Sequence, residues 1–312
     1  MRDILLELVT AKFLFVYAYF GCILYVHFRG KERLRFGRQV LEHSGILAPY
    51  NVLMYAFSAV PNTPLLNARD FPELDRLRDN WEIIRDEALA LNDAGRIEYT
   101  DKQIDLTFMS FRKRGWKRFH LKWYDDYLPS ARALCPRTVE LISSVPSINA
   151  AAFTMLPPGT ELGKHRDPLA GSLRYHLGLV TPNSDDCSLW VDGDRYSWRD
   201  GEDVVFDETY IHWAANKTDQ TRIILFCDMT RPLHTRFVRG ISNFMNKRVF
   251  KITGSRNEET ETSGLLNRAT PMIFAAKTFF ANIKERNRQL YYAGKYTLGG
   301  LLAAAILYAA FR

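Results

Sequence analysis

From about residue 147 to residue 232 the chain consists of short segments punctuated by turn residues. These segments are rich in β-branched and aromatic residues and are separated by Gly, Asp and Pro; they are INAAAFTML, SLRYHLGLV, SLWVDG, RYSWRDG, DVVFD and TRIILFCDM. Strands of this length and spacing, with turn residues between them, are typical of an antiparallel sandwich or barrel. Helical periodicity on both sides of this region makes the predicted fold class α+β.

The flanking segments carry apolar residues at helical spacing. An amphipathic helix is predicted from Phe71 onward, and residues 121–144 are predicted to be helical, with Pro136 near a helix start. After Pro232 the segment VRGISNFMNKRVFKI has helical spacing again, and it is both basic and amphipathic. Helices are therefore expected before and after the strands.

His165 and Asp167 stand two positions apart in the segment GKHRDP. Side chains two residues apart in an extended segment face the same way, so this pair can hold one metal ion from one side. His212, from a distant strand, would complete a set of two imidazoles and one carboxylate. This is the facial triad of non-haem iron(II) oxygenases, which leaves three coordination positions open. A structural or sensory metal site is the alternative interpretation.

Two arginines accompany the predicted metal site. In the strand Ser172–Val180, alternation places Arg174 and His176 on one face and only apolar or aromatic side chains on the other. Ten residues after His212, Arg222 opens another strand. A guanidinium there can pair bidentately with a carboxylate. A dicarboxylic co-substrate needs this arrangement, because one end chelates iron while the far end is held by an arginine.

The segment from about Phe71 to Pro232 resembles the aspartyl/asparaginyl β-hydroxylase family of 2-oxoglutarate-dependent oxygenases. The resemblance rests on NWEIIRDEA, GWKRFHLKWY, LPPGTELGKHRDP, LRYHLGLVTP and WRDGEDVVFDETYIHWAANKTDQTRIILFCDMTRP, and on the positions of Gly201 and Asn216 around His212. It implies a double-stranded β-helix, a cupin-like jelly roll, for a catalytic domain over residues 67–232. It also implies a hydroxylase that uses Fe(II) and takes 2-oxoglutarate and O2 as co-substrates.

Position by position, the resemblance implies that His165, Asp167 and His212 bind the iron. Some family members carry glycine at the aspartate position, which leaves a site of two histidines as the alternative. Arg222 is implied as the salt-bridge partner of 2-oxoglutarate. Further contacts to this co-substrate are implied for Arg174, His176 and Thr154.

Both ends of the chain are apolar. Phe13–Phe28 contains no Asp, Glu, Lys or Arg, and RGKERLRFGR follows it with five basic residues against one acid. Residues 1–28 are therefore predicted to be a transmembrane anchor and residues 29–66 a basic juxtamembrane connector; a cleaved signal peptide is the alternative. Residues 233–295 are predicted to be a basic amphipathic helical region. Residues 296–312 are predicted to be a C-terminal transmembrane segment or a membrane-embedded one that does not span.

The net charge of +7 is concentrated after the apolar ends and in Phe111–Phe119, FRKRGWKRF. This distribution favours an anionic membrane surface over a nucleic acid. The basic segment is predicted to bind lipid phosphates, with Trp116 and Phe119 at the acyl boundary; a solvated basic loop is the alternative. The four cysteines form no CxxC pair, which favours a reducing compartment.

Within the family, the apolar ends and basic flanks resemble the bacterial lipid A 2-hydroxylases. This resemblance implies hydroxylation of a lipid A acyl chain next to its ester carbonyl, at the cytoplasmic face of the bacterial inner membrane. The same chemistry on an ornithine lipid or on a protein Asp/Asn side chain is one alternative. A non-enzymatic metal-binding cupin that scaffolds a membrane complex is another. No nucleic acid and no obligate protein partner are expected.

Several other polar residues are predicted to be structural. His43, His120 and His234 have no acidic partner at ligand spacing, so we expect them at the surface or in satisfied structural positions. Asp228 and Arg231, at the end of the last core strand, are predicted to pair with each other.

Overall fold

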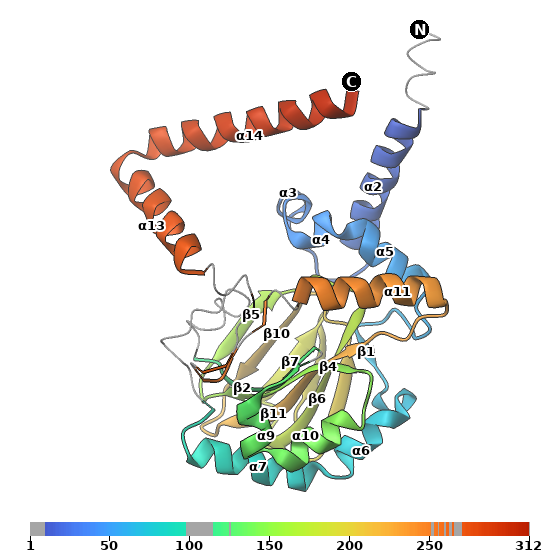
Figure 1. The fold of residues 1–312 in the computed structure, drawn as a ribbon, viewed down its shortest axis with the longest axis vertical. Coiled ribbons are helices and arrows are strands. Elements are labelled where there is room, and N and C mark those ends of the chain that lie inside the picture. The colour runs from blue at the N-terminus through green and yellow to red at the C-terminus, as the bar shows by residue number, and fades with distance from the viewer. Residues whose placement is uncertain are drawn as a thin grey trace. The chain divides into compact units, whose positions relative to one another are not determined.

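The computed structural model describes residues 10–97, 115–124, 126–250, 253–254, 256–258, 260–261, 264 and 270–311. The chain divides into two compact units, Tyr19–Asn267 and Met1–Ala18 with Arg268–Arg312. Both β-sheets belong to the first of these units (Figure 1).

A seven-stranded antiparallel sheet is the largest element of the first unit. Its central strands are long and largely buried, and β11 pairs with β4 on one side and with β6 on the other. The strand order is β1 (Leu65–Leu66), β9 (Asp203–Phe206), β6 (Ser172–Val180), β11 (Arg222–Thr230), β4 (Ile148–Leu156), β2 (Lys117–Trp123) and β3 (Asp126–Tyr127).

A four-stranded antiparallel sheet packs against one face of the larger sheet. Its strand order is β5 (Glu161–His165), β10 (His212–Asn216), β7 (Cys187–Val191) and β8 (Asp194–Ser197). One hydrophobic cluster joins the sheets, because it contains Leu189 and Ala214 of the smaller sheet with Phe206 and Ile224 of the larger. Two antiparallel sheets packed in this way confirm the α+β fold class with a cupin-like jelly-roll core.

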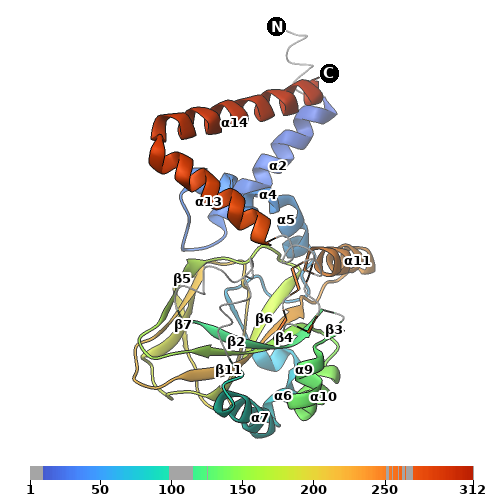
Figure 2. The same cartoon turned by 60° about the vertical axis from the view of Figure 1, so that its left-hand side comes forward.

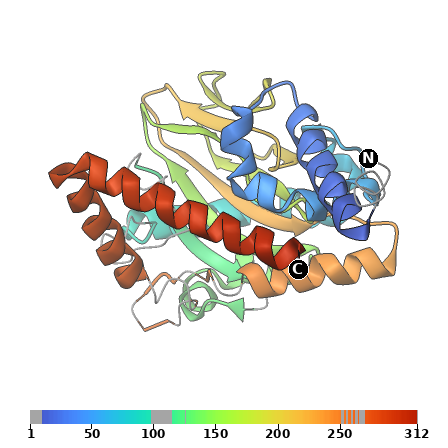
Figure 3. The same ribbon diagram turned by 90° about the horizontal axis from the view of Figure 1, so that it is seen from above.

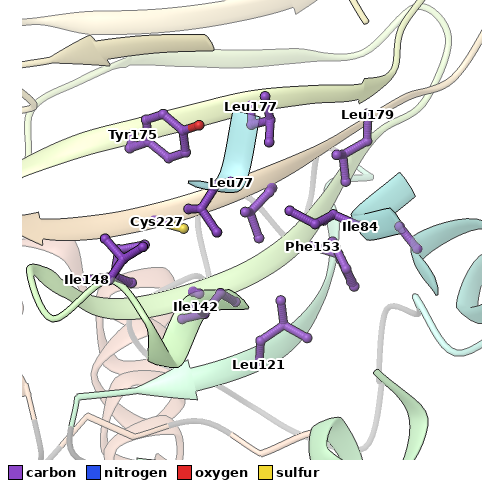
Figure 4. Close-up of a cluster of buried hydrophobic side chains, with 14 of the residues drawn as sticks. Leu77, Ile84, Leu121, Ile142, Ile148, Phe153, Tyr175, Leu177, Leu179 and Cys227 are labelled. Carbon is purple, nitrogen blue, oxygen red and sulfur yellow. The ribbon is translucent and has the colours of Figure 1, made fainter. Parts of the chain in front are cut away.

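Short helices cover the other face of the larger sheet (Figure 2). Figure 4 shows the cluster beneath them, in which Leu77 and Ile84 of the helices meet Phe153 and Tyr175 of the sheet. The alternation predicted for β6 is confirmed, since its apolar face lies in this cluster. The helical elements in this region are η1 (Ala68–Asp70), η2 (Pro72–Leu74), α6 (Asp75–Arg78), α7 (Trp81–Asp93), α9 (Pro129–Leu134) and α10 (Pro136–Ser143).

The predicted helices are right in type and differ in their bounds. The helix expected from Phe71 is interrupted at Asn80, whose side-chain amide donates to the Arg76 carbonyl at 2.9 Å. Short amide and carboxylate side chains compete in this way for backbone groups and interrupt helices. The prediction that residues 121–144 are helical is wrong at its start, because Leu121 belongs to β2. Pro136 does begin a helix, where its missing N–H costs no hydrogen bond.

The predicted transmembrane segments at residues 1–28 and 296–312 are not confirmed. Among the described residues, which exclude residues 1–9 and Arg312, no helix is long and apolar enough to cross a membrane. The second half of α2 (Ala11–Phe28) packs instead on the jelly-roll unit. Its Ile23 and Val26 are buried in a cluster with Met54 and Leu233. That contact with protein is the physical reason for correcting the prediction over this half.

Residues 29–56, part of the predicted connector, continue this packing. They form α3 (Phe36–Val40), α4 (His43–Ile46) and α5 (Ala48–Ala56). Arg29 is buried, forms an ion pair with Asp207, and lies between the rings of Tyr55 and Tyr210 at 3.8 Å from each centroid. A cation predicted to face a membrane is therefore part of the protein interior.

Asp207 also pairs with Arg231, at 2.7 Å. The predicted pair of Asp228 with Arg231 is wrong, because Asp228 faces Arg174 at 3.0 Å instead. Two residues three apart at the end of a strand point in different directions, so proximity in sequence did not bring these two charges together.

The C-terminal part of the chain is helical, as predicted. In the first unit α11 (Arg236–Met245) is followed by the π-helix η3 (Asn246–Phe250). In the second unit α13 (Thr270–Arg286) and α14 (Arg288–Phe311) contact each other. Figure 3 looks down on the first unit and, with Figure 1, shows α11 and the helices of residues 36–56 at the same end of the sandwich.

Candidate active site

The structure brings His165, Asp167 and His212 together. His165 ends β5 and His212 begins β10, and the two are direct partners in the register of the smaller sheet. One possible ligand atom from each of the three residues lies within 4.8 Å of the other two. The loop after β5 is held by a hydrogen bond from the Asp167 backbone N–H to the Glu208 carbonyl, at 2.8 Å. The adjoining ends of β5 and β10, with the loop after β5, thus place the three side chains together.

The two imidazoles have the orientation expected of metal ligands. Nδ1 of His165 lies 2.7 Å from the Gly163 carbonyl, and Nδ1 of His212 lies 3.0 Å from the Tyr210 carbonyl. A neutral imidazole that donates from Nδ1 to a carbonyl carries its lone pair on Nε2, where a metal can bind. Burial, reinforced by the neighbouring His165, lowers the pKa of His212 to about 3, so this ring is neutral at pH 7.

Asp167 supplies the negative charge of the triad. Burial opposes its ionisation, but Arg174 and the two imidazoles outweigh burial and lower the pKa of Asp167 to about 2. Two imidazoles and one carboxylate suit a divalent iron ion. The donor set and the spacing of its atoms therefore fit the group that the sequence implies.

Arg174 is surrounded by carboxylates. Its guanidinium donates to Asp167 at 2.6 Å and from Nε to Glu208 at 2.7 Å, and it lies 3.0 Å from Asp228. Glu208 also accepts from the Ser172 hydroxyl at 2.6 Å. Arg174 was predicted to contact the co-substrate; in the structure its charge is balanced by these acids, and it fixes the orientation of Asp167.

Arg222 has no such partners. It is 2% exposed, its Nε has no hydrogen-bond partner among the described residues, and its terminal nitrogen lies 3.5 Å from the Thr154 hydroxyl. Burial lowers its pKa to about 10, so it remains a cation at pH 7. His176 is also buried, and neither ring nitrogen has a partner among the residues described. Arg222, with Thr154 beside it, and His176 are thus buried polar groups whose hydrogen-bonding capacity a ligand could satisfy.

All seven predicted site residues line one cavity of about 340 Å³. The rest of the described lining is mainly aromatic and small, and includes Trp198 and Phe226 near the polar groups and Ala150 and Ala152 on β4. A concave, largely apolar pocket with a few convergent polar groups is the usual form of a small-molecule site.

Sequence comparison assigns this site to a family. Residues 78–232 match the family model described as aspartyl/asparaginyl beta-hydroxylase. An ornithine lipid ester-linked acyl 2-hydroxylase of Rhizobium tropici is 31% identical over 210 residues, which are 66% of this chain and 74% of that protein. The chain belongs to the aspartyl/asparaginyl β-hydroxylase family.

Other members of the family are similar over less of their length. The human aspartyl/asparaginyl beta-hydroxylase is 27% identical over 162 residues, which are 50% of this chain and only 21% of the human protein. Among solved structures, a Pseudomonas putida prolyl-4-hydroxylase aligns over 49% of this chain and 87% of its own, with 16% identity and a TM-score of 0.33. Membership of the family makes the chain a hydroxylase relative and leaves its substrate open.

Several polar residues that line the cavity were not singled out as functional by the sequence, among them Glu208, which accepts from Arg174. His43 comes from α4, His120 from β2, and Arg166 stands between two predicted iron ligands. His43 and His120 each make a hydrogen bond, as expected of satisfied structural residues, and both also line the cavity. No sequence spacing links α4 or β2 to the metal site, because tertiary packing alone brings them there. Arg166 was passed over because its side chain alternates away from its two neighbours in a strand.

The basic segment Phe111–Phe119 is described only in part. Residues 111–114 lie outside the described residues, so their predicted contact with lipid phosphates stays a prediction. Trp116 lines the cavity, with its ring 6.3 Å from that of Phe226. Phe119 lies in the core between the larger sheet and its helices, so its predicted place at an acyl boundary is wrong. Trp116 directly precedes β2 and Phe119 lies within it, and side chains three positions apart in an extended segment face opposite sides.

Proposed function

We propose that the chain is an Fe(II)- and 2-oxoglutarate-dependent dioxygenase that hydroxylates an ester-linked acyl chain of a bacterial membrane lipid at its 2-position. The observation that carries the proposal is the content of one cavity, in which the triad of His165, Asp167 and His212 lies together with Arg222. No carboxylate of the described residues pairs with this buried guanidinium, and its Nε has no hydrogen-bond partner among them. A metal site alone would explain the triad and leave a buried guanidinium without a purpose. A dicarboxylic co-substrate explains both.

His165, Asp167 and His212 would hold the iron. Bound there, Fe(II) supplies the chemistry that couples oxidation of 2-oxoglutarate by O2, to succinate and CO2, with insertion of the second oxygen atom into a substrate C–H bond. Arg174 keeps the Asp167 carboxylate ionised and oriented through its contact at 2.6 Å. Residues that contact metal ligands in this way fix the geometry of the ligands and tune the affinity for the metal.

Arg222 binds the far carboxylate of 2-oxoglutarate. Its planar fork suits bidentate pairing, and the Thr154 hydroxyl beside it can donate a further hydrogen bond. His176 contributes a neutral ring, because burial lowers its pKa well below the usual value. Trp198 and Phe226 enclose these groups and exclude water, which strengthens each polar contact made inside. These residues bind and orient the co-substrate.

The lipid substrate that we favour is lipid A, with an ornithine lipid as the second candidate. The net charge of +7 supports a phosphorylated lipid, since phosphates attract a basic protein to the membrane surface. The name of the Rhizobium tropici relative supports the ornithine lipid. Both candidates share the reaction at the carbon next to an ester carbonyl. We place the enzyme at the cytoplasmic face of the inner membrane, where its four unpaired cysteines stay reduced.

Helix α11 supports contact with an anionic membrane surface. It buries Val238 and Ser242 on one side and exposes Phe237 and Phe244 on the other, by 78% and 60%. Residues seven apart lie on the same face of a helix. Arg236 and other basic side chains flank the two rings. Exposed aromatics surrounded by cations are the composition of a helix that lies in a lipid interface.

The test is mass spectrometry of total lipids from bacterial cells that express the intact chain or the His212→Ala variant. We expect one lipid class to gain a single oxygen atom only with the intact chain, with the oxygen on the acyl carbon next to the ester carbonyl. Oxygen on lipid A supports the first candidate, and oxygen on an ornithine lipid supports the second. If no lipid changes and the purified protein consumes no 2-oxoglutarate, the proposal fails in favour of a non-enzymatic metal-binding scaffold.

A further inference from the structure

Arg166 is a buried cation that the proposed chemistry does not use. Its side chain lines the cavity and is 6% exposed, and its Nε has no hydrogen-bond partner among the described residues. Its backbone carbonyl lies 3.0 Å from Nε2 of His43, and this contact holds the main chain in place without touching the guanidinium. The guanidinium therefore lies at the cavity wall, and no anion in the described part of the chain is hydrogen-bonded to it.

Two acids, Asp192 and Glu42, act electrostatically on Arg166 without forming an ion pair with it in the described part of the chain. Asp192 accepts the backbone N–H groups of Lys31 and Glu32, each at 2.8 Å. Oε1 of Glu42 lies 3.5 Å from Arg38, and its Oε2 is buried without a hydrogen-bond partner among the described residues. These carboxylates act on Arg166 only through space, and burial lowers its pKa from the ordinary value. A guanidinium buried without a direct partner has lost hydration that no ion pair replaces, which is unfavourable.

The described walls of the cavity carry three arginines, and only Arg174 has a matching set of acids. Arg222 is assigned to the far carboxylate of 2-oxoglutarate under the proposed function. Arg166 is left without an anion. A binding site that contains an unpaired cation is complementary to a ligand with negative charge, because that ligand recovers the cost of desolvation on binding.

The positions of Arg166 and Arg222 separate their ligands. Asp167, next to Arg166 in the chain, contacts Arg174, which faces Asp228 near the end of β11. Arg222 begins β11, at the opposite end of this strand from Asp228. Arg166 is thus near the Asp228 end, where His43 of α4 also enters the wall. The anion at Arg166 is accordingly not the co-substrate carboxylate that Arg222 holds.

We propose that Arg166 binds an oxyanion of the lipid head group, a phosphate or a carboxylate, and thereby places the acyl carbon next to the ester at the metal site. This inference rests on the proposed function and adds to it the part of the substrate that is recognised. The end of the cavity at Arg166 borders α4, among the helices that share the end of the sandwich with α11 (Figure 1). A lipid held at that surface would present its polar group to this end of the cavity.

The test compares the full chain with Arg166→Gln, Arg166→Lys and a matched control, Lys164→Gln. Lys164 lies on β5, two residues before Arg166, and its side chain is 58% exposed and pairs with Glu32. It does not line the cavity, so its replacement removes one positive charge without altering the lining. Hydroxylation of lipid in detergent micelles is followed by mass spectrometry to give KM and kcat. Affinity for 2-oxoglutarate is measured separately by calorimetry under anaerobic conditions with Fe(II).

We expect Arg166→Gln to raise KM for the lipid by about 10- to 100-fold, the range for losing a charge-assisted hydrogen bond, with affinity for 2-oxoglutarate unchanged. Arg166→Lys should recover part of the loss, because it restores charge without the planar fork. Lys164→Gln should behave as the intact chain. An unchanged KM for Arg166→Gln overturns the inference and leaves the proposed function standing. So does a parallel loss of 2-oxoglutarate affinity, which would make Arg166 a support of the metal site.

Two lipid pairs identify the source of the anion. One pair is lipid A with and without its phosphates, and the other is an ornithine lipid and its carboxyl methyl ester. If a phosphate is bound, the difference in KM between the intact chain and Arg166→Gln disappears on dephosphorylated lipid A; if a carboxylate is bound, it disappears on the methyl ester. A difference that persists on both neutralised lipids overturns the inference. If the intact chain hydroxylates neither lipid, the proposed function and the inference both fail.

Discussion

At the scale of single residues, the two arginines of β6 and β11 show how local surroundings decide a role. Arg174 and Arg222 are both buried on the cavity face of the same sheet, and the sequence predicted one role for both. Arg174 has three acids around it, whereas Nε of Arg222 has no partner among the described residues. Only Arg222 keeps a guanidinium that must find its anion in a ligand.

Arg222→Ala should therefore weaken binding of 2-oxoglutarate by at least about 30-fold, because truncating one partner of a buried, charge-assisted pair costs about 2–5 kcal/mol. Calorimetric titration of the purified chain with 2-oxoglutarate measures this directly. The control is Arg199→Ala, whose side chain pairs with Asp185 at 2.6 Å and does not line the cavity. Equal affinities for Arg222→Ala and the intact chain would contradict the assignment of Arg222 to the co-substrate.

At the scale of elements, Asp207 ties the N-terminal segment to the end of β11. It pairs with Arg29 and with Arg231, and all three side chains are buried. Burial opposes ionisation of Asp207, but the two guanidiniums outweigh it and keep its pKa far below the usual range. Removing one partner of a buried ion pair leaves the other charge uncompensated.

Asp207→Asn should lower the free energy of unfolding at pH 7 by about 3–5 kcal/mol. A carboxyl whose pKa is depressed by folding stabilises the protein above its unfolded pKa, about 3.9, and loses that contribution as the pH falls toward its folded pKa. The intact chain should lose stability between these two values, and the variant should lose less. Urea titrations at pH 7 and in acid measure both effects. Asp194→Asn, which breaks an exposed pair with Lys31, should leave the unfolding midpoint at pH 7 unchanged.

Helix α11 is the element that we expect to meet the membrane. Replacing Phe237 and Phe244 together by Ser should reduce binding to vesicles of anionic phospholipid by at least about tenfold, because two aromatic side chains no longer enter the interface. Sedimentation with vesicles at low and high salt measures the loss. Asn243→Ala, on the exposed part of the same helix, is the control. Unchanged binding of the double variant would assign membrane contact to other elements.

At the scale of the whole molecule, the sequence predicted the jelly-roll core and the composition of its cavity well. Alternation in β6 and β11 places side chains on opposite faces, and a pattern of period two cannot be satisfied by a helix. The sequence could not predict which apolar segments pack on protein and which meet lipid. Ile23 and Val26 are as apolar as a membrane-facing residue, and only their tertiary neighbours show that they are buried against α5 and α11. Arg29 and Arg166 were missed for the same reason, since the partners of a buried charge come from distant segments.

The buried half of α2 leads to a prediction that separates an anchor from a structural helix. Removing residues 1–18 should leave the thermal unfolding of the Tyr19–Asn267 unit unchanged, because the contacts of Ile23 and Val26 remain. Removing residues 1–28 exposes the cluster beneath them, and each aliphatic side chain contributes about 1.5–3 kcal/mol on burial. The longer truncation should therefore lower the unfolding temperature by several degrees in scanning calorimetry. If both truncations unfold at the same temperature, α2 acts only as a tether, and its packing adds nothing to the stability of the catalytic unit.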